Sequence, residues 1–313
     1  MLKDYLRLHL IVLLWGFTAI LGKLLQPMPP VELVFWRTLL ASAGLGGLLL
    51  ARRVGWRVAP REALKLLGVG VLIAAHWITF FLAARLSSVS VCLAGLATLA
   101  LWTSILEPLL LWRPVRPYEV GLGLAAMVGL YLISQADSTA LQLNGLLVAI
   151  GSAGLSSLFS VLNSQLVKQH APVRLAFYEM IGACLSISLF FPVYTRYLAP
   201  DHQLHLGWQH LDWLWLGLLA GACTVYALAS SVELMKRISA FVVNLTINLE
   251  PVYGIVLAQI LFVLHVPGFG QERMSLGFYA GTVLILASVL VHPLLDRWNQ
   301  RRIRQQEAAE VVV

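Results

Sequence analysis

The stretch ARRVGWRVAPREALKLLGVGVLIAAHWITFFLAARL, residues 51–86, contains the pattern from which the fold class can be predicted. Five Lys or Arg side chains fall within residues 51–65, and none falls within residues 66–84. An apolar run of that length crosses a hydrocarbon layer of ~30 Å as a helix that rises ~1.5 Å per residue. Because basic residues collect on the cytoplasmic side of membranes, the stretch predicts a transmembrane helix that starts in the cytoplasm and emerges before Arg85.

Nine more apolar stretches repeat this pattern. They are residues 8–25, 31–50, 89–112, 120–135, 144–166, 175–195, 211–232, 239–264 and 275–295. The intervening loops place 17 Lys or Arg residues on one side and four on the other. The richer side holds Lys3, Arg7, Arg52, Arg53, Arg57, Arg61, Lys65, Arg113, Arg116, Lys168, Arg174, Lys236, Arg237, Arg297, Arg301, Arg302 and Arg304. The poorer side holds Lys23, Arg85, Arg196 and Arg273, whereas Arg37 lies within a span. The sequence therefore predicts an all-α polytopic membrane protein with ten transmembrane helices and both termini in the cytoplasm.

Composition agrees with a membrane location. The chain is 59% hydrophobic and 12% charged, with a mean hydropathy of +0.81, which excludes an ordinary soluble domain. The net charge of +7 resides mainly in the basic loops, where anionic lipid is expected to attract it. We therefore expect the lipid bilayer and a small-molecule substrate as partners, and no nucleic acid.

The chain is built twice. Leu14-Trp15 is echoed by Leu158-Phe159, Phe35-Trp36-Arg37 by Phe177-Tyr178-Glu179, and His76-Trp77 by Val225-Tyr226. The shared order and the near-constant offset indicate an internal duplication. Five helices per half is an odd number, so the second copy enters the membrane from the opposite side as an inverted repeat. Such repeats build carriers that work by alternating access, although a duplication can also simply enlarge a bundle.

Short motifs resemble a known family. In the first half they are Leu14-Trp15-Gly16-Phe17-Thr18, Lys23, Pro30 and Phe35-Trp36-Arg37. In the second half they are Gly145, Ile238-Ser239-Ala240, Glu250-Pro251, Gln271-Glu272-Arg273 and Gly281. Over roughly residues 8–295 this pattern resembles the EamA-type members of the drug/metabolite transporter superfamily.

The resemblance implies a ten-helix carrier in the bacterial inner membrane. It implies two EamA-like repeats, at residues 8–135 and 144–295, followed by a cytoplasmic tail at 296–313. The central cavity is then lined mainly by spans 1, 3, 4, 6, 8 and 9, and many such members export amino acids or other metabolites. One departure is Arg113-Pro114, where the family usually has an acidic residue.

Ionisable side chains within spans are costly and therefore need a partner, water or a function. The candidates in this sequence are Arg37, His76, Glu107, Glu179 and Glu250. The motif Thr-x-x-Leu-Glu-Pro carries both Glu107 and Glu250, but only Glu250 is near the middle of its span. Inverted symmetry places Arg37 and Glu179 on opposite sides of the midplane, so no direct pair between them is expected.

Glu250 is the leading candidate for binding substrate or a coupling proton. Asn244 and Asn248 stack on one face of the same span, because residues four apart are neighbours on a helix. Lipid does not tolerate such a polar helix, so this span must face protein or water. An interhelical hydrogen bond by Glu250 is the structural alternative.

Further candidates lie in other spans. His76 can titrate near neutral pH or donate one hydrogen bond to a neighbouring helix. Trp15, Trp77 and Tyr226 lie away from the interfaces where Trp and Tyr are usual, which suits an aromatic-lined cavity or ordinary packing. Arg37 contacts either substrate or neighbouring carbonyl groups. Glu107 and Asn163 complete the set of candidate residues.

Rows of small residues predict close helix packing. Ser152, Ser156, Ser160 and Ser164 are each four apart in span six. Spans five and ten carry Gly121, Ala125 and Gly129, and Gly277 and Gly281. Because these two spans are poor in polar residues, they are the predicted face of a homodimer.

Other function classes lack their motifs. No phosphate-binding loop, Gly-x-Ser-x-Gly elbow or His-Glu-x-x-His is present, so neither an enzyme nor a cofactor is expected. The outer loop 196–212 contains His202, His205 and His210, but in no known ligand spacing, so no metal is expected. The sequence favours a secondary exporter of small metabolites. A channel and a lipid or lipid-linked-sugar translocator remain the alternatives.

Overall fold

The protein is described by a computed structural model covering residues 2–25, 28–87, 89–134, 143–199, 201–209, 211–265 and 275–310. Every regular element within these ranges is a helix. In chain order they are α1 (Leu2–Leu24), α2 (Pro30–Ala51), α3 (Pro60–Leu86), α4 (Val89–Leu96), α5 (Leu99–Leu111), α6 (Pro117–Ser134), α7 (Leu143–Leu166), α8 (Pro172–Tyr197), α9 (Asp212–Ala220), the π-helix η1 (Gly221–Tyr226), α10 (Ala227–Leu234), α11 (Ala240–Ile247), α12 (Glu250–Val263) and α13 (Leu276–Glu310). His210 and the motif Gln271-Glu272-Arg273 lie outside the described residues.

The described residues form ten passes across the bundle. Eight described helical segments have the length and apolar composition of membrane spans. The α4–α5 pair and α6, which contain the shorter apolar helices, make the other two passes. The predicted fold class is confirmed: the chain is an all-α multi-pass membrane protein with five passes in each half. Pass one leads from Arg7 to Lys23, and we call the two faces of the bundle the Arg7 side and the Lys23 side.

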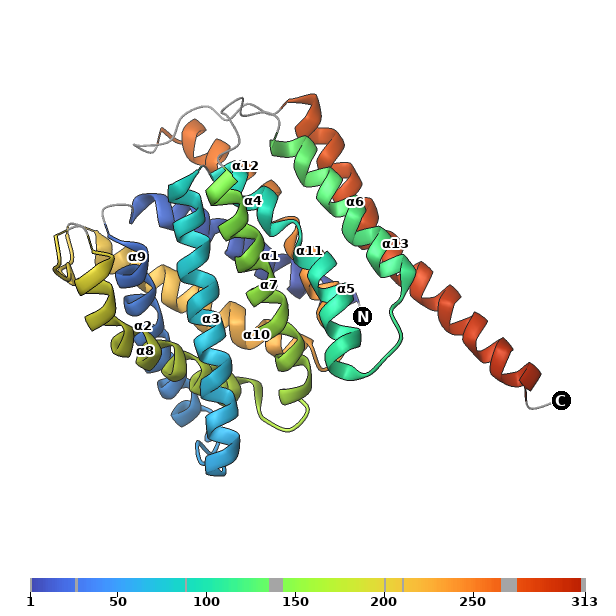
Figure 1. Cartoon of the computed structure of the whole chain (residues 1–313), viewed down its shortest axis with the longest axis horizontal. Coiled ribbons are helices and arrows are strands. Elements are labelled where there is room, and N and C mark those ends of the chain that lie inside the picture. The colour runs from blue at the N-terminus through green and yellow to red at the C-terminus, as the bar shows by residue number, and fades with distance from the viewer. Residues whose placement is uncertain are drawn as a thin grey trace.

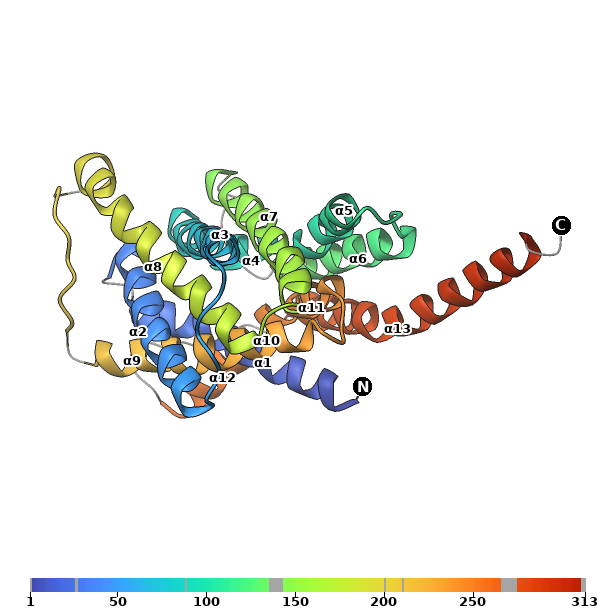
Figure 2. The same ribbon diagram turned by 90° about the horizontal axis from the view of Figure 1, so that it is seen from below.

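Helices of the two halves contact each other extensively, so the halves do not form separate units. Helix α3 of the first half lies against α7 and α8 of the second, α2 lies against α8, and α1 lies against α12. Helices α6 and α13 run together along one flank, and α13 carries the C-terminus beyond the bundle (Figures 1 and 2). Residues 296–310 continue α13, so the expected tail is helical where it is described.

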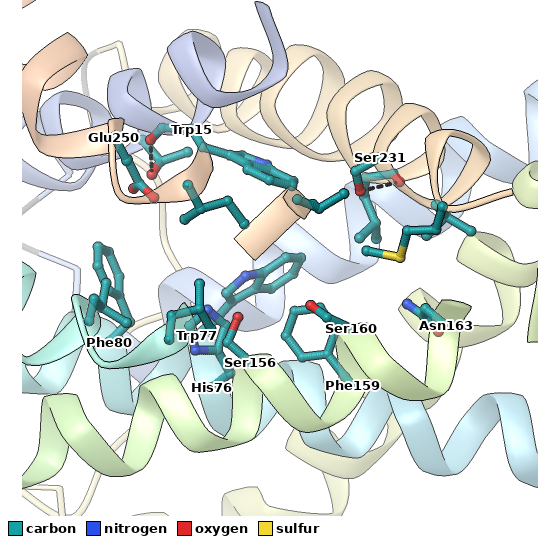
Figure 3. A pocket seen from close by; sticks show the side chains of 18 of the residues that line it. Trp15, His76, Trp77, Phe80, Ser156, Phe159, Ser160, Asn163, Ser231 and Glu250 are labelled. Carbon is teal, nitrogen blue, oxygen red and sulfur yellow. Dashed lines mark hydrogen bonds between the residues drawn. The ribbon is translucent and has the colours of Figure 1, made fainter. Parts of the chain in front are cut away.

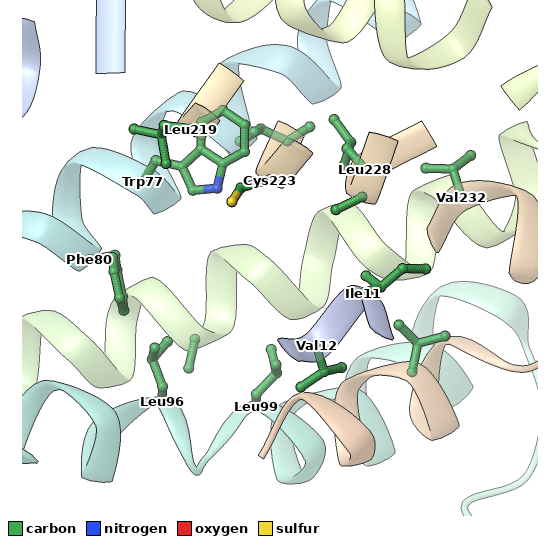
Figure 4. Packing of buried hydrophobic residues seen from close by; sticks show 14 of the residues in the cluster. Ile11, Val12, Trp77, Phe80, Leu96, Leu99, Leu219, Cys223, Leu228 and Val232 are labelled. Carbon is green, nitrogen blue, oxygen red and sulfur yellow. The ribbon is translucent and has the colours of Figure 1, made fainter. Parts of the chain in front are cut away.

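Apolar side chains fill the space between the halves. Figure 4 shows residues of α1, α3, α4, α5 and α10 meeting there, including Val12, Phe80, Leu96, Leu99 and Val232. Each has less than a tenth of its surface exposed. In lipid this packing contributes mainly through close van der Waals contact, because the lipid tails are as apolar as the side chains.

Passes four and nine are interrupted helices, whereas the sequence predicted continuous ones. In pass nine α11 ends at Ile247 and α12 starts at Glu250. Pro251 has no N–H to donate to the preceding turn, so the helix restarts with proline in its first turn. In pass four the hydroxyl of Thr98 donates to the carbonyl of Gly95 at 2.8 Å, which competes with the helical hydrogen bonds between α4 and α5. The two breaks occupy corresponding positions in the two halves.

Pass eight contains the π-helix η1. The hydroxyl of Thr224 donates to the carbonyl of Leu219, five residues earlier, at 2.8 Å. Single widened turns of this kind occur often at functional sites, because they turn carbonyl groups and side chains away from their helical positions. Here the widened turn presents Thr224 and the carbonyl of Cys223 to first-half helices.

The glycines of passes five and ten contact each other within the chain. A Cβ atom at Gly281 would lie 2.2 Å from the carbonyl oxygen of Gly129, and one at Gly277 would lie 2.6 Å from that of Leu132. These small residues therefore serve the α6–α13 crossing. A homodimer through the outer faces of the same two passes stays a prediction.

Candidate functional site

A cavity of about 80 Å³ lies between the two halves. Figure 3 shows Glu250 and Trp15 across the cavity from His76, Trp77 and Phe159. The lining residues are Trp15, Thr18, Arg37, His76, Trp77, Phe80, Leu96, Leu99, Ser156, Phe159, Ser160, Asn163, Leu228, Ser231, Val232, Met235, Val243, Ile247 and Glu250. They come from passes 1, 3, 4, 6, 8 and 9, with Arg37 added from pass two. A cavity of this size holds several water molecules.

Arg37 supplies the positive charge of the cavity. Its side chain is held from two sides: Nε donates to Oγ1 of Thr224 at 2.8 Å, and the guanidinium carbon lies 3.6 Å from the ring centroid of Trp77. A desolvated cation over an indole ring is stabilised by about 2 kcal/mol. Within the described chain, the terminal nitrogens have no hydrogen-bond acceptor, so they can donate to a ligand in the cavity.

Glu250 supplies the acidic group of the cavity. It is the first residue of α12, where the helix dipole favours an anion. The backbone of α1 approaches it closely, since a Cβ atom at Gly16 would lie 2.9 Å from the carbonyl oxygen of Glu250. In the described part of the chain the carboxylate has no ion pair and no hydrogen-bond donor, although the charge of Arg37 attracts it. The carboxylate is therefore left to water or to a ligand.

His76 joins the halves and faces the cavity. Its Nδ1 lies 3.0 Å from the carbonyl oxygen of Ser152 and 2.9 Å from Oγ of the same residue. The Ser152 hydroxyl donates in turn to the carbonyl of His76 at 2.9 Å. A carbonyl oxygen only accepts, so this network assigns the proton to Nδ1 and makes Nε2 the acceptor of a neutral ring.

Aromatic side chains form much of the wall. Nε1 of Trp15 donates to the carbonyl of Cys223 at 3.2 Å, which fixes the indole against η1. The ring of Phe159 lies 5.7 Å from that of His76, centroid to centroid. Trp15 and Phe159 are repeat equivalents and both line the cavity. The sequence analysis did not select Phe159, although its equivalence to Trp15 was a usable signal.

Six of the ten candidate residues thus line one cavity. They are Trp15, Arg37, His76, Trp77, Asn163 and Glu250. The structure places the other four, Glu107, Tyr226, Asn244 and Asn248, elsewhere, and each has a physical reason.

Asn244 is held between helices and does not reach the cavity. Its amide nitrogen donates to Oγ1 of Thr103 at 2.7 Å, and its oxygen accepts from Ser160 at 3.2 Å. Thr103 also contacts the hydroxyl of Ser157 at 2.9 Å. This polar cluster ties α5, α7 and α11 together. Asn248 is buried beside the helix break, outside the cavity lining.

Tyr226 and Glu107 also lie away from the cavity. Tyr226 is 40% exposed on the outside of the bundle, because the widened turn of η1 changes the face on which it emerges. Glu107 lies 3.0 Å from Arg113, which in turn lies 3.2 Å from Glu119. Arg116 extends this ion-pair network to Asp296 on α13. Glu107 therefore fastens passes four, five and ten at the Arg7 side.

The two faces of the bundle differ in closure. At the Lys23 side a second cavity of about 470 Å³ is lined by Lys23, Arg85 and Ser87 among others, and Phe80 borders both cavities. At the Arg7 side Arg7 pairs with Glu233 at 2.8 Å, and Arg237 with Asp4 at 2.7 Å.

These two ion pairs join α1 of the first half to the end of pass eight in the second. The hydrogen bond with Asp4 raises the pKa of Arg237. The Arg7 side is thus closed by ion pairs between the halves, and the wider cavity lies at the Lys23 side.

Comparisons with known proteins agree on the architecture. A solved structure titled "Crystal structure of protein" is similar, with a TM-score of 0.73 and 20% sequence identity over 94% of this chain and 98% of the other. At that identity the likeness concerns the fold alone. No curated protein matches the chain. The sequence pattern of the EamA-like transporter family matches residues 4–135 and again residues 143–292.

Proposed function

Because this chain belongs to the EamA-like transporter family, we propose that it is a secondary exporter of small amphipathic metabolites, amino acids in particular. It works by alternating access between its two inverted repeats. The repeats are residues 8–135 and 144–295, and the segment 296–313 follows them on the cytoplasmic side.

One observation carries the proposal: Arg37 and Glu250 face the same cavity without forming a salt bridge with each other in the described chain. A zwitterionic amino acid has a carboxylate that the guanidinium of Arg37 can bind and an ammonium group that the carboxylate of Glu250 can bind. Nε2 of His76 is an additional acceptor for the ammonium group. Trp15, Trp77 and the neighbouring aromatic rings suit an apolar or aromatic side chain.

The basic loops orient the protein in the membrane. The Arg7 side, where 17 Lys or Arg residues collect, is the cytoplasmic face, and the Lys23 side is the outside of a bacterial inner membrane. With the larger cavity at the Lys23 side and ion pairs at the Arg7 side, the molecule is in a state closed to the cytoplasm.

Counterflow in proteoliposomes tests the proposal. Vesicles loaded with one unlabelled amino acid are supplied with the same labelled compound, over a panel of apolar, aromatic and polar amino acids. Trans-acceleration with saturation supports a carrier. Conductance without saturation would make the protein a channel, and exchange of none of the panel would remove amino acids as substrates.

Glu250→Gln addresses the site itself. The variant keeps the shape of the side chain and removes its charge, so exchange of zwitterionic amino acids should fall by roughly 10-fold or more, as expected for losing a charge-assisted contact. If well-folded Glu250→Gln protein exchanges amino acids at the wild-type rate and with the wild-type KM, Glu250 does not bind the substrate.

A further inference from the structure

Glu179 is a buried carboxyl group that the proposed binding site does not use. It lies on α8, is 0% exposed, and neither of its oxygens has a hydrogen-bond donor. A charged carboxylate in such surroundings is costly, which favours the neutral, protonated form. Asn163 is the polar side chain beside it, and its amide faces the carboxyl without closing a hydrogen bond.

Asn163 connects this carboxyl to the central cavity. It lines the cavity, is 1% exposed, and has no hydrogen bond at either amide atom. Two unsatisfied polar groups in contact are unusual in a packed interior, because each forfeits about 1–3 kcal/mol of hydrogen bonding. Such an arrangement is expected where the groups exchange partners during function.

Among the described residues, no charged side chain on the neighbouring helices forms an ion pair with the buried carboxyl of Glu179. The titratable groups on helices packed against α8 are Glu32 and Arg37 on α2, Arg61, Glu62, Lys65, His76 and Arg85 on α3, and Glu233 on α10; α7 has none. Arg37 is held by Thr224, Glu62 by Lys65 and His170, and Glu233 by Arg7. On α8 itself Arg174 and Tyr178 bind the loop at Gly55 and Trp56, and Cys184 lies further along. None of these described groups forms an ion pair with Glu179.

The internal repeat relates Glu179 to Arg37. Helix α2 begins PVELVFWR at residues 30–37, and helix α8 begins PVRLAFYE at residues 172–179. Both start at a proline, and Arg37 and Glu179 are the eighth residues. In an inverted repeat, equivalent residues lie at mirrored depths and exchange environments when the two halves exchange conformations. At present Arg37 lines the cavity and Glu179 is covered.

We propose that Glu179 is the coupling-proton site: it holds a proton while covered by Asn163 and releases it to the cavity when the halves exchange conformations. The inference rests on the proposed alternating-access function. The step is a simple protonation, in which a carboxylate takes a proton from water on one side and returns it to water on the other. The cavity then alternates between presenting Arg37 and presenting Glu179.

Transport by the full-length protein in proteoliposomes tests the assignment. Glu179→Gln should retain counterflow of the amino acid that the wild type exchanges fastest. It should lose accumulation driven by a pH gradient, with the concentration ratio across the membrane falling to one. Glu32→Gln is the matched control, because Glu32 is equally buried without hydrogen bonds but lies in the first turn of α2, five residues before the cavity-lining Arg37. Accumulation by Glu179→Gln at the wild-type ratio would overturn the proposal.

A second measurement needs no substrate. Dicyclohexylcarbodiimide modifies protonated carboxyls in apolar surroundings, and mass spectrometry locates the product. Modification of Glu179 should decline with rising pH as a titration curve. No modification, or the same extent at every pH, would overturn the assignment even if the variant folds poorly. If the wild-type protein shows no counterflow, the proposed transport function is refuted. The pH dependence of the modification would then still test whether Glu179 binds a proton.

Discussion

Arg37 shows how one charged side chain is held beside a cavity inside a membrane protein. The guanidinium is planar, so it can stack on Trp77 and bond to Thr224 while its remaining donors stay unused. A lysine in its place would keep the charge without the planar stacking or the Nε donor. The geometry, and not the charge alone, therefore sets the position of the cation.

Replacing Arg37 with lysine tests that geometry. Losing a desolvated cation–π contact of about 2 kcal/mol should raise KM by roughly 10- to 30-fold, with less effect on the maximal exchange rate. Arg61→Lys, at an exposed position, is the control and should leave both unchanged. An unaltered KM in Arg37→Lys would mean that the stacking does not position the substrate group.

Asn244 is predicted to act in stability rather than in binding. Asn244→Ala removes contacts with Thr103 and Ser160, and interhelical hydrogen bonds in membranes contribute about 0.6–1.7 kcal/mol each. The melting temperature in detergent should fall, while exchange per folded molecule stays normal. Asn248→Ala should cost less, because the amide nitrogen of Asn248 has no hydrogen bond to lose. If Asn244→Ala loses exchange while its melting temperature is unchanged, Asn244 takes part in binding and not in stability.

Among the helices, interrupted and widened turns position several of the side chains that line the cavity. Glu250 reaches the cavity at the restart of pass nine, and η1 in pass eight gives Arg37 and Trp15 their partners. Irregular backbone at this depth is tolerated where it is buried in protein or lines a cavity. Discontinuous helices at corresponding positions of two repeats are also typical of transporter binding sites.

The crossing of α3 and α8 depends on two glycines. A Cβ atom at Gly70 would lie 2.1 Å from the carbonyl oxygen of Glu179, and one at Gly182 would lie 2.2 Å from that of Leu67. Gly70→Ala and Gly182→Ala should therefore each destabilise the folded protein by about 1–3 kcal/mol, through forced separation of the helices.

Gly68→Ala is the matched control on the same helix, since a Cβ atom there meets nothing within 4 Å. Alanine should stabilise that position by up to ~1 kcal/mol through helix propensity. Thermal unfolding in detergent measures all three variants. Equal melting temperatures for Gly70→Ala and Gly68→Ala would contradict the close crossing.

At the scale of the whole molecule, the two faces carry different chemistry. One face is closed by ion pairs between α1 and the end of pass eight, whereas the other holds the larger cavity with Lys23 and Arg85. Phe80 lines both that cavity and the central one. The arrangement is asymmetric across the membrane although the chain is built from two similar halves.

Cysteine labelling tests how these faces are oriented. In a variant without Cys92, Cys184 and Cys223, a cysteine introduced at Gln203 should react with a membrane-impermeant maleimide in intact cells. One introduced at Gly55 should react only after permeabilisation, because the basic loops are predicted to be cytoplasmic. Both positions are exposed in the structure. The reverse labelling pattern would show that the Arg7 side faces outward. The proposed direction of export would then be wrong.

The passes, the duplication and several cavity residues could be predicted from the amino-acid sequence alone. Span length and charge asymmetry are properties of short segments against the bilayer, so they can be read without knowing which helices meet. The depth of Arg37 and Glu250 followed from the same counting. Repeat equivalence also related Trp15 to Phe159 before any packing was known.

Which polar side chains face the cavity could not be predicted from the sequence and depends on how the helices pack. A polar helix face must avoid lipid, but it can meet either a neighbouring helix, as Asn244 does, or a cavity, as Glu250 does. That choice depends on how helices from distant parts of the chain pack and where each helix breaks. Tyr226 is the clearest case, because the widened turn of η1 placed it outside the bundle. Interhelical packing is non-local, and the pattern within one span does not record it.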